Sequence, residues 1–230
     1  MSENSVAPKT YRPNIKALRE RAKQAGESKY WKIPVGISRF RILPAWDPND
    51  EVRTFTVDQV LHYRFKKDGS DIALPCLAAM WGEPCPACIL HGWIDKNSDK
   101  ELAKEMRPQV KAYYNIVLRP ANELKIWSVG PQRRDEIFSL LDTEDYADCL
   151  DPEKGRDWIL TREGTGKNDT RYPSFMPAPN PSPIGVDGWQ SLLTDLRKEF
   201  VDSKKMTREE AIKIIYGTYA ALYPLDEILA

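Results

Sequence analysis

Three cysteines and a histidine in a short stretch of the chain have the residue types and the spacing of a zinc site. Cys85-Pro86-Ala87-Cys88 is a Cys-x-x-Cys turn, Cys76 precedes it in the chain, and His62 lies further upstream. Tetrahedral zinc takes four nitrogen or sulfur ligands, and a Cys-x-x-Cys turn supplies two of them from one tight knuckle. The spacing therefore predicts one zinc ion. If all four ligands come from the protein, the site is structural, because no position is left for substrate.

Three alternatives remain open for these residues, and the simplest is that the thiols are merely buried small side chains. His91 follows Cys88 closely, so a helix that begins at the knuckle could bring His91 to the metal in place of His62. Cys-Pro-Ala-Cys also has the spacing of a thiol–disulfide redox centre, which would hold no metal. The turn before Cys85 and the third cysteine nearby favour a metal site. Cys149 stands apart and is expected to be an ordinary thiol.

The composition is that of a soluble globular protein. The chain has 230 residues, of which 41% are hydrophobic and 30% charged, and its formal net charge is zero. No apolar run approaches the roughly 18 residues that span a bilayer, and the N-terminal residues contain no secretory signal. We therefore expect a cytoplasmic protein, in which cysteines are metal ligands or thiols more often than disulfides. Both histidines are candidate ligands, so no catalytic triad can form, and we expect no enzyme.

Charge is unevenly distributed along this neutral chain. Residues 9–41 are rich in lysine and arginine and contain only Glu20 and Glu27 as acids, whereas residues 142–153 contain acids and no basic residue. Segregated charge can form a positive groove on a neutral protein, because phosphates respond to the local potential. The alternative is that the basic run is simply the solvated face of a helix.

The apolar pattern predicts a mainly β chain with added helices, which is an α+β class. Strands are expected at 30–36, 39–43, 54–57, 60–65, 113–118, 124–129 and 158–161, with a hairpin turn at 67–69. Helices are expected at 15–24, 89–93, 100–106, 133–141, 189–201 and 207–219. The prolines between 173 and 183 predict a segment that leaves the sheet. Short strands without βαβ alternation favour a small barrel, and an OB-like barrel is compatible with this pattern.

The segment around the cysteines resembles the single-stranded-DNA-binding (helix-destabilising) proteins of T-even phages. It reads His62-Tyr63-Arg64-Phe65-Lys66-Lys67-Asp68-Gly69, then Cys76, then Cys85-Pro86-Ala87-Cys88. The family has the same order of histidine, Phe-Lys-Lys hairpin, cysteine and Cys-Pro-x-Cys, with the first cysteine displaced by about one residue. Segments 39–44, 112–117 and 125–130 are similar to its barrel strands. The resemblance covers about residues 30–215 and favours His62 over His91.

The resemblance implies an OB-fold barrel with an inserted zinc subdomain and helical N- and C-terminal extensions. Its parts would be a basic arm and short helix at 1–29, a core at 30–185 with the zinc subdomain at about 60–95, and C-terminal helices at 186–230. It implies sequence-nonspecific binding of single-stranded DNA in phage DNA replication, recombination and repair, in the host cytoplasm. Expected partners are the DNA, other copies of the chain along it, and replication proteins. The family's long acidic tail has no counterpart in the last residues of this sequence, and its basic N-terminal motif is only loosely echoed by residues 9–12.

Binding single strands without sequence preference requires cations for the phosphates and aromatic faces for the bases. The expected DNA contacts are Arg39, Arg41, Arg64, Lys66, Lys67, Arg107, Lys111 and Arg119, with Tyr113, Trp127 and Tyr172 as stacking residues. Trp81 is a further stacking candidate, and Tyr113 and Tyr114 should face opposite ways on their strand. Trp31, Trp158 and Trp189 are expected to pack in the core. For each stacking candidate, packing in the core is the alternative to contact with a base.

Two other functions compete with DNA binding. A zinc-ribbon adaptor that binds protein partners would contain zinc but have little salt-dependent affinity for DNA. A thiol oxidoreductase that uses Cys85 and Cys88 would contain no metal and would form a readily reducible disulfide.

Overall fold

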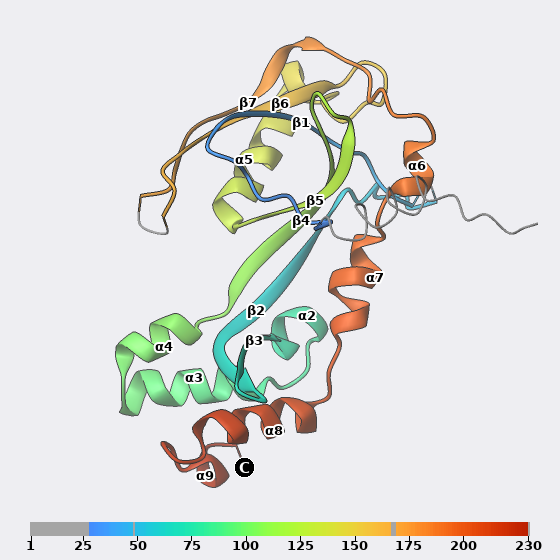
Figure 1. Cartoon of the computed structure of the whole chain (residues 1–230). Coiled ribbons are helices and arrows are strands. Elements are labelled where there is room, and N and C mark those ends of the chain that lie inside the picture. Colours follow the sequence, from blue (N-terminus) through green and yellow to red (C-terminus); the bar gives the residue numbers. More distant parts are fainter. Residues whose placement is uncertain (1–27, 48, 167–168, 230) are drawn as a thin grey trace, which may run out of the picture.

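The computed structural model describes residues 28–47, 49–166 and 169–229. Within these ranges, seven strands form one sheet, and helices pack around it (Figure 1). The strands are β1 (Gly36–Ile42), β2 (Thr56–Lys67), β3 (Ser70–Pro75), β4 (Gln109–Leu118), β5 (Glu123–Val129), β6 (Arg156–Glu163) and β7 (Arg171–Pro181). Their order is β3-β2-β4-β1-β6-β7, and β5 pairs with the other edge of β4. All of these pairs are antiparallel, and one parallel bridge joins Tyr30 to Ile126.

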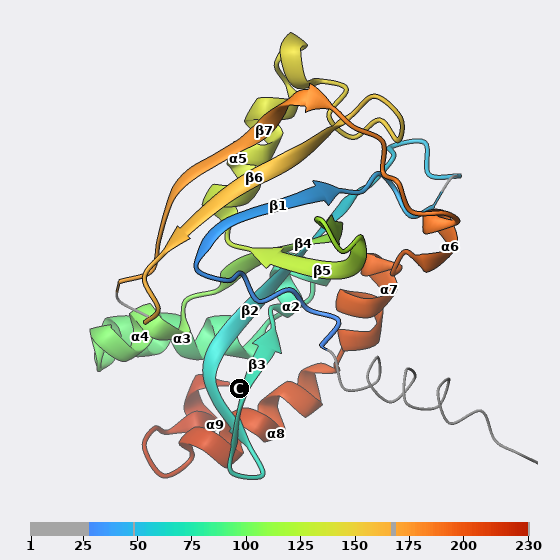
Figure 2. The same cartoon turned by 45° about the horizontal axis from the view of Figure 1, so that its top comes forward.

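Most helices gather at the two ends of this sheet (Figures 1 and 2). They are α2 (Leu77–Trp81), α3 (Pro86–Asn97), α4 (Lys100–Met106), α5 (Pro131–Leu141), α6 (Trp189–Leu192), α7 (Leu196–Phe200), α8 (Arg208–Tyr219) and α9 (Leu225–Ile228). Helices α3, α4, α8 and α9 surround the β2–β3 hairpin, whereas α5 lies near β6 and β7. Within the described ranges, none of these helices has both the length and the apolar composition to cross a bilayer.

The long strand β2 belongs to both ends of the molecule. Its first half, Thr56–Leu61, pairs with β4, and its second half pairs with β3. A register shift separates the pairs at His62 and Phe65, and the intervening Arg64 has a φ of 74°. The bulge turns the hairpin away from the main sheet, so that one strand connects the central sheet to the region that contains the cysteines. The hairpin closes at Asp68 and Gly69, both with positive φ, as the sequence predicts.

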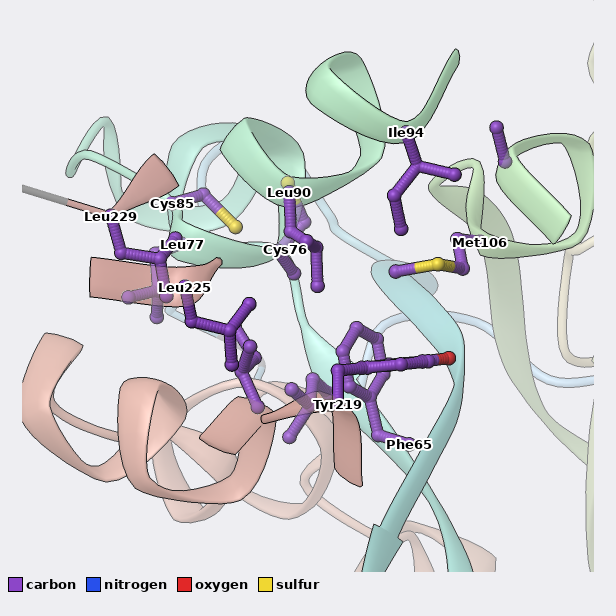
Figure 3. Close-up of a cluster of buried hydrophobic side chains, with 14 residues drawn as sticks. Phe65, Cys76, Leu77, Cys85, Leu90, Ile94, Met106, Tyr219, Leu225 and Leu229 are labelled. Atoms are coloured by element: carbon purple, nitrogen blue, oxygen red, sulfur yellow. The ribbon is translucent and has the colours of Figure 1, made fainter. Parts of the chain in front are cut away.

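Two large cores fill these two ends. The sheet core lies among β1, β4, β5 and β6 and includes Phe40, Tyr114, Ile116, Trp127 and Trp158. The metal-side core is drawn in Figure 3 and includes Phe65, Cys76, Cys85, Leu90, Ile94, Met106, Ile215, Tyr219 and Leu225. It therefore combines the expected subdomain at about 60–95 with α4, α8 and α9. A hairpin and a short helix have too little apolar surface to bury by themselves, and the C-terminal helices cover what remains.

The structure confirms a mixed α/β chain with a mostly antiparallel sheet. The described strands leave the sheet open, with β3 and β7 at its ends, so a closed OB barrel stays a prediction. The expected helix at 15–24 and the basic residues 9–12 lie outside the described residues.

The prediction that the proline-rich segment leaves the sheet is wrong. Instead of leaving the sheet, residues 171–181 form β7, which pairs with β6. Prolines 173, 177, 179 and 181 stand at alternate positions of this strand. Their nitrogens have no hydrogen to donate, so they can all face the edge of β7 that no described strand covers.

The expected helix at 189–201 is broken into α6 and α7. Thr194 lies between them, and its backbone N–H donates a hydrogen bond to the side-chain oxygen of Asn115 on β4 (3.1 Å). The Asn115 amide nitrogen in turn donates to the carbonyl of Thr194 (2.9 Å). Asp195 then begins α7 by accepting from the N–H of Lys198. Bonding to a buried asparagine thus replaces the helical hydrogen bonds that the local pattern predicts.

Helix α8 begins at a capping box, as the sequence predicts. The Thr207 hydroxyl accepts from the N–H of Glu210 (3.1 Å), and the Glu210 carboxylate accepts from the N–H of Thr207 (2.8 Å). We expect Thr207→Ala to lower the free energy of unfolding by about 0.5–2 kcal/mol, because Glu210 N–H loses its acceptor. Urea denaturation measures this loss, and Thr165→Ala, at an exposed threonine outside any helix, is the matched control. Equal stability of the two variants would contradict the role of Thr207.

Candidate functional site

The four predicted ligands are brought together at the base of the β2–β3 hairpin. His62 lies on β2, and Cys76 follows β3 directly, held there by its N–H, which donates to the carbonyl of Val60 (2.8 Å). Cys85 is the N-cap of α3, and Cys88 lies in its first turn. Pro86 occupies the first helical position, where its fixed φ favours the helix and its missing N–H costs no hydrogen bond. The Cys-x-x-Cys turn is thus the start of a helix.

Three of the distances between the ligand atoms match those of a tetrahedral metal site. Nε2 of His62 lies 3.4 Å from Sγ of Cys88 and 3.7 Å from Sγ of Cys85, and the sulfurs of Cys76 and Cys88 are 3.5 Å apart. All four ligand atoms lie within 4.8 Å of one another. Zinc–ligand bonds of about 2.0–2.3 Å at tetrahedral angles would place such atoms roughly 3.5–3.8 Å apart. The group has the size and the donor atoms to hold a metal ion.

A second contact fixes the orientation of the histidine. Nδ1 of His62 donates to the carbonyl oxygen of Met106 (2.9 Å), and the His62 side chain is fully buried. In a neutral imidazole this bond keeps the proton on Nδ1, so that Nε2 can face the sulfurs as a ligand, which is how ligating histidines are usually held. His91 is not part of the cluster. The choice between the two histidines is therefore made by the position of β2 against α4.

The thiols differ in their tendency to ionise. A hydrogen bond from the Cys76 thiol, together with His62, lowers the pKa of Cys85 to about 3. The same hydrogen bond raises the pKa of Cys76, and burial raises that of Cys88. Cys85 is thus the thiol that ionises most readily, and a divalent cation would favour the ionised form of all three. A low thiol pKa also suits a redox centre at Cys85 and Cys88, in which Cys88 is half-buried and Cys85 is only 4% exposed, so that access of a disulfide substrate to Cys85 is restricted.

A groove lined with lysines lies at the tip of the hairpin whose base carries the metal-ligand cluster. It lies between this tip, the segment 203–206 and α8, and its volume is 880 Å³. We call it the lysine groove, and its cations are Lys66, Lys67, Lys204, Lys205 and Lys213. The acids that line it are Asp68 and Glu210, and the Glu210 carboxylate is bound to the N-terminus of α8. Lys205 pairs with Glu83 outside the groove (3.0 Å). The groove therefore has an excess of positive charge.

Hydrogen bonds hold the two walls of the lysine groove together. The hydroxyl oxygen of Thr218, on α8, accepts from the N–H of Lys66 (3.0 Å). The hydroxyl of Tyr219 donates to the carbonyl of Arg64 (2.5 Å), and its ring packs edge-on against Phe65. The lysines of the hairpin are thus kept at a set distance from those of the C-terminal segment.

Lys204, Lys205 and Lys213 are not among the DNA contacts that the sequence predicts. Lys204-Lys205 is visible as a basic pair in the sequence, but nothing local joins it to a hairpin that lies far back in the chain. The other predicted surface residues are more scattered. Arg64 is paired with Glu105 (2.7 Å), Arg107 is exposed at the end of α4, and Lys111 lies 5.9 Å from the ring centroid of Tyr63.

Three predicted DNA contacts are contradicted by burial. Arg41 and Trp127 are 0% and 1% exposed, and Tyr113 is 7% exposed. Tyr113 stacks face to face on Phe200 of α7, with ring centroids 3.6 Å apart, and burial raises its pKa to about 12. Its neighbour Tyr114 is buried on the other side of β4, in the sheet core. Because the sheet is covered on both faces here, neither tyrosine offers an open stacking surface.

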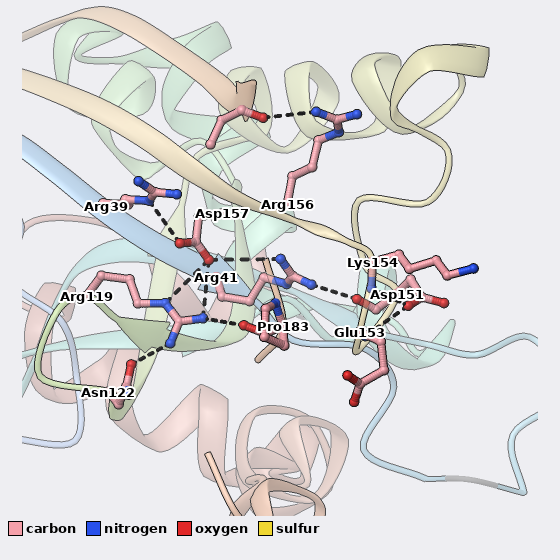
Figure 4. Close-up of polar contacts among 11 residues, drawn as sticks. Arg39, Arg41, Arg119, Asn122, Asp151, Glu153, Lys154, Arg156, Asp157 and Pro183 are labelled. Atoms are coloured by element: carbon pink, nitrogen blue, oxygen red, sulfur yellow. Dashed lines mark hydrogen bonds and ion pairs between the residues drawn. The ribbon is translucent and has the colours of Figure 1, made fainter. Parts of the chain in front are cut away.

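Both arginines of β1 approach a buried carboxylate, although only Arg41 is itself buried and Arg39 remains exposed. Asp157, on β6, is 3% exposed and lies among Arg39, Arg41 and Arg119 (Figure 4). Nε of Arg39 donates to it at 2.9 Å, Nη2 of Arg119 at 3.3 Å, and Nη1 of Arg41 lies 3.9 Å away. Burial lowers the pKa of Arg41, and the charge of Asp157 opposes this effect. We call this group the Asp157 cluster. It joins β1, β4 and β6.

The remaining aromatic residues and Cys149 differ in how far they are buried. Trp158 lies in the sheet core, and Trp31 and Trp189 pack against cores, as expected. Tyr172 is 39% exposed on β7, and Trp81 is half-buried 5.9 Å from Lys205. Cys149 is buried away from the ligand cluster, and burial raises its pKa to about 11, which fits an unreactive thiol.

The metal-ligand cluster and the lysine groove are built on the same hairpin. Four ligand atoms fix its base, and its tip carries two of the five lysines of the groove. The arrangement could hold a metal ion at the base of the hairpin, and it places an excess of positive charge at the tip. No protein-family model matches the chain, and no curated protein matches it.

Proposed function

We propose that this protein binds single-stranded DNA without sequence preference and is not an enzyme. The observation that carries the proposal is the lysine groove, a cavity of 880 Å³ lined by five lysines, whose ammonium groups can neutralise phosphates. Lysine is a flexible point charge, which suits phosphates of variable spacing better than one fixed anion. The resemblance to phage helix-destabilising proteins adds a role in replication, recombination and repair, and partners that include other copies of the chain and replication proteins.

We propose zinc as the ion of the metal-ligand cluster. Three thiolates and one imidazole form a Cys3His set, which is typical of structural zinc. Four protein ligands would leave no position for substrate or water. The ion would then act by fixing the hairpin, and with it Lys66 and Lys67, against the C-terminal helices.

The proposal is tested by titrating the protein with fluorescent oligo-dT at several salt concentrations, with duplex DNA as competitor and zinc measured alongside. We expect one zinc per chain, a preference for the single strand, and affinity that falls steeply as salt rises. Zinc without DNA binding would favour the protein-binding adaptor. The absence of both, with a readily reducible disulfide at Cys85 and Cys88, would favour a thiol oxidoreductase.

The lysine groove gives a specific prediction for this titration. We expect Lys67→Gln, Lys204→Gln and Lys213→Gln, combined in one variant, to weaken binding. The slope of log affinity against log salt should also decrease by about 0.7 for each phosphate that the variant no longer neutralises. The control combines Lys96→Gln, Lys154→Gln and Lys198→Gln, which remove the same charge from exposed lysines that do not line the groove. Equal salt slopes for the two triple variants would show that the groove is not the phosphate path.

A further inference from the structure

A small pocket lies beside the outer edge of β5, and we call it the edge pocket. Its volume is 270 Å³, and its lining includes Ile33, Trp127, Ser128, Arg133, Leu160 and Tyr172. These residues come from β5, β6, β7, the start of α5 and the segment that precedes β1. The pocket is separate from the lysine groove and shares no lining residue with it.

At this pocket, the outer edge of β5 pairs with no residue in the described ranges. The N–H of Ile126 donates to the carbonyl of Lys29 (2.8 Å), and the carbonyl of Ile126 accepts from the N–H of Trp31 (2.9 Å). Alternate residues of a strand direct their polar groups to the same edge, so the N–H and C=O of Ser128 face outwards as well. Continued pairing would join Ser128 to residues 31 and 33.

Neither of those bonds forms in the described part of the chain. The carbonyl of Ile33 instead accepts from the guanidinium of Arg162 on β6, so the segment turns away from β5. Ser128 is exposed and lines the pocket. One hydrogen-bond donor and one acceptor of the same residue therefore face the cavity together.

The walls of the edge pocket are apolar and aromatic. Trp127, 1% exposed, lies at its buried end, and Tyr172, 39% exposed, lies at its rim. Ile33 and Leu160 add aliphatic surface. The guanidinium of Arg133 lies 5.9 Å from the ring centroid of Tyr172 and pairs with Glu136. A flat, weakly polar ligand would bury its faces here and direct one polar edge to Ser128.

We propose that the edge pocket binds a nucleobase of single-stranded nucleic acid. This inference rests on the proposed function and adds a base site to its phosphate groove. Every nucleobase has a donor next to an acceptor on its Watson–Crick edge, which is accessible only in single strands. The N–H and C=O of Ser128 can pair with that edge, while the ring stacks beside Tyr172.

The size and chemistry of the pocket fit this ligand better than others. Pockets for drug-sized ligands span about 300–1,000 Å³, so a cavity of 270 Å³ suits one heterocycle and excludes a dinucleotide. A peptide strand would need several consecutive unpaired residues on β5, whereas Ser128 alone among the described pocket residues of this strand offers an open pair. Because all bases share the donor–acceptor edge, the site would bind bases without strong sequence preference.

The test compares two substitutions at Ser128. Its N–H faces away from β4, so Ser128→Pro removes the donor while leaving the β4–β5 ladder in place. Ser128→Ala keeps the backbone donor and removes only the hydroxyl. Each variant is titrated with oligo-dT and with an abasic oligonucleotide of the same length. We expect the wild-type protein and Ser128→Ala to prefer the base-bearing strand, and Ser128→Pro to reduce that preference by about fivefold or more.

Tyr172→Ala is a second variant that leaves the backbone unchanged, and it should reduce the same preference. Retention of the wild-type preference by Tyr172→Ala and by folded Ser128→Pro would overturn the base site. Equal binding of the two oligonucleotides by the wild-type protein would overturn it as well and leave the phosphate groove standing. Failure of the wild-type protein to bind either strand would instead overturn the proposed function and the inference together.

Discussion

Replacing a ligand of the metal-ligand cluster is expected to abolish zinc binding and to unfold the metal-side core. The relevant variants are His62→Gln and Cys85→Ser. Both ligands are buried, and Cys85 and Cys76 are themselves part of that core. Loss of the ion would leave buried thiols and a buried imidazole without the metal that joins them.

The size of the effect follows from the energy of metal binding. Structural zinc in isolated modules contributes about 10–16 kcal/mol of apparent binding energy, while a whole domain is stable by only about 5–15 kcal/mol. The sheet core shares no buried residue with the metal-side core, so we expect it to remain folded. The ion is held by thiolates and a neutral imidazole, and protons compete with the metal for these groups, so acidification should release zinc and produce the same partial unfolding.

The measurements are the zinc content of the purified variants and thermal unfolding before and after a chelator is added. His91→Gln and Cys149→Ser are the matched controls, because they change the same residue types outside the cluster. They should retain one zinc per chain. A full zinc content in His62→Gln together with loss in His91→Gln would mean that the ligand set is wrong.

Neutralising Asp157 is the second change with a large expected effect. Asp157→Asn would leave Arg41, which is 0% exposed, without its nearby negative charge. Breaking a buried ion pair from one side typically costs about 3–5 kcal/mol, because the remaining charge is uncompensated. Nε and Nη1 of Arg41 already have no hydrogen-bond acceptor among the described residues, which leaves no substitute for the carboxylate. We therefore expect the loss of unfolding free energy to approach that range.

Urea denaturation checks this expectation, with Asp145→Asn as a control at an exposed acid outside the Asp157 cluster. Gly155→Ala perturbs the same region without a change in charge. A Cβ atom at residue 155 would lie 2.5 Å from Nη2 of Arg41 and from the carbonyl oxygens of Cys149 and Asp151. Both Asp157→Asn and Gly155→Ala should be destabilising. If Asp157→Asn is as stable as Asp145→Asn, the cluster does not stabilise the fold.

Much of the local structure could be predicted from the sequence. Helix α4 and the capping box of α8 depend on residues within one or two turns of each other, and the pattern of caps and apolar positions predicts them. Positive φ at Asp68 and Gly69 likewise follows from the turn chemistry of an Asp-Gly hairpin. The prolines of β7 were misleading, because only the position of that strand at the sheet edge makes them acceptable.

By itself, the sequence determined the residue types of the metal-ligand cluster, because the ligands lie close together in the chain and zinc imposes their spacing. Only the tertiary structure decided between His62 and His91, since the choice depends on a carbonyl of α4. It also decided that Arg41 neutralises a buried carboxylate and that Lys66 shares a groove with Lys213. The physical reason is the same in each case. Burial and local potential are set by segments far apart in the chain, and no pattern within one segment contains that information.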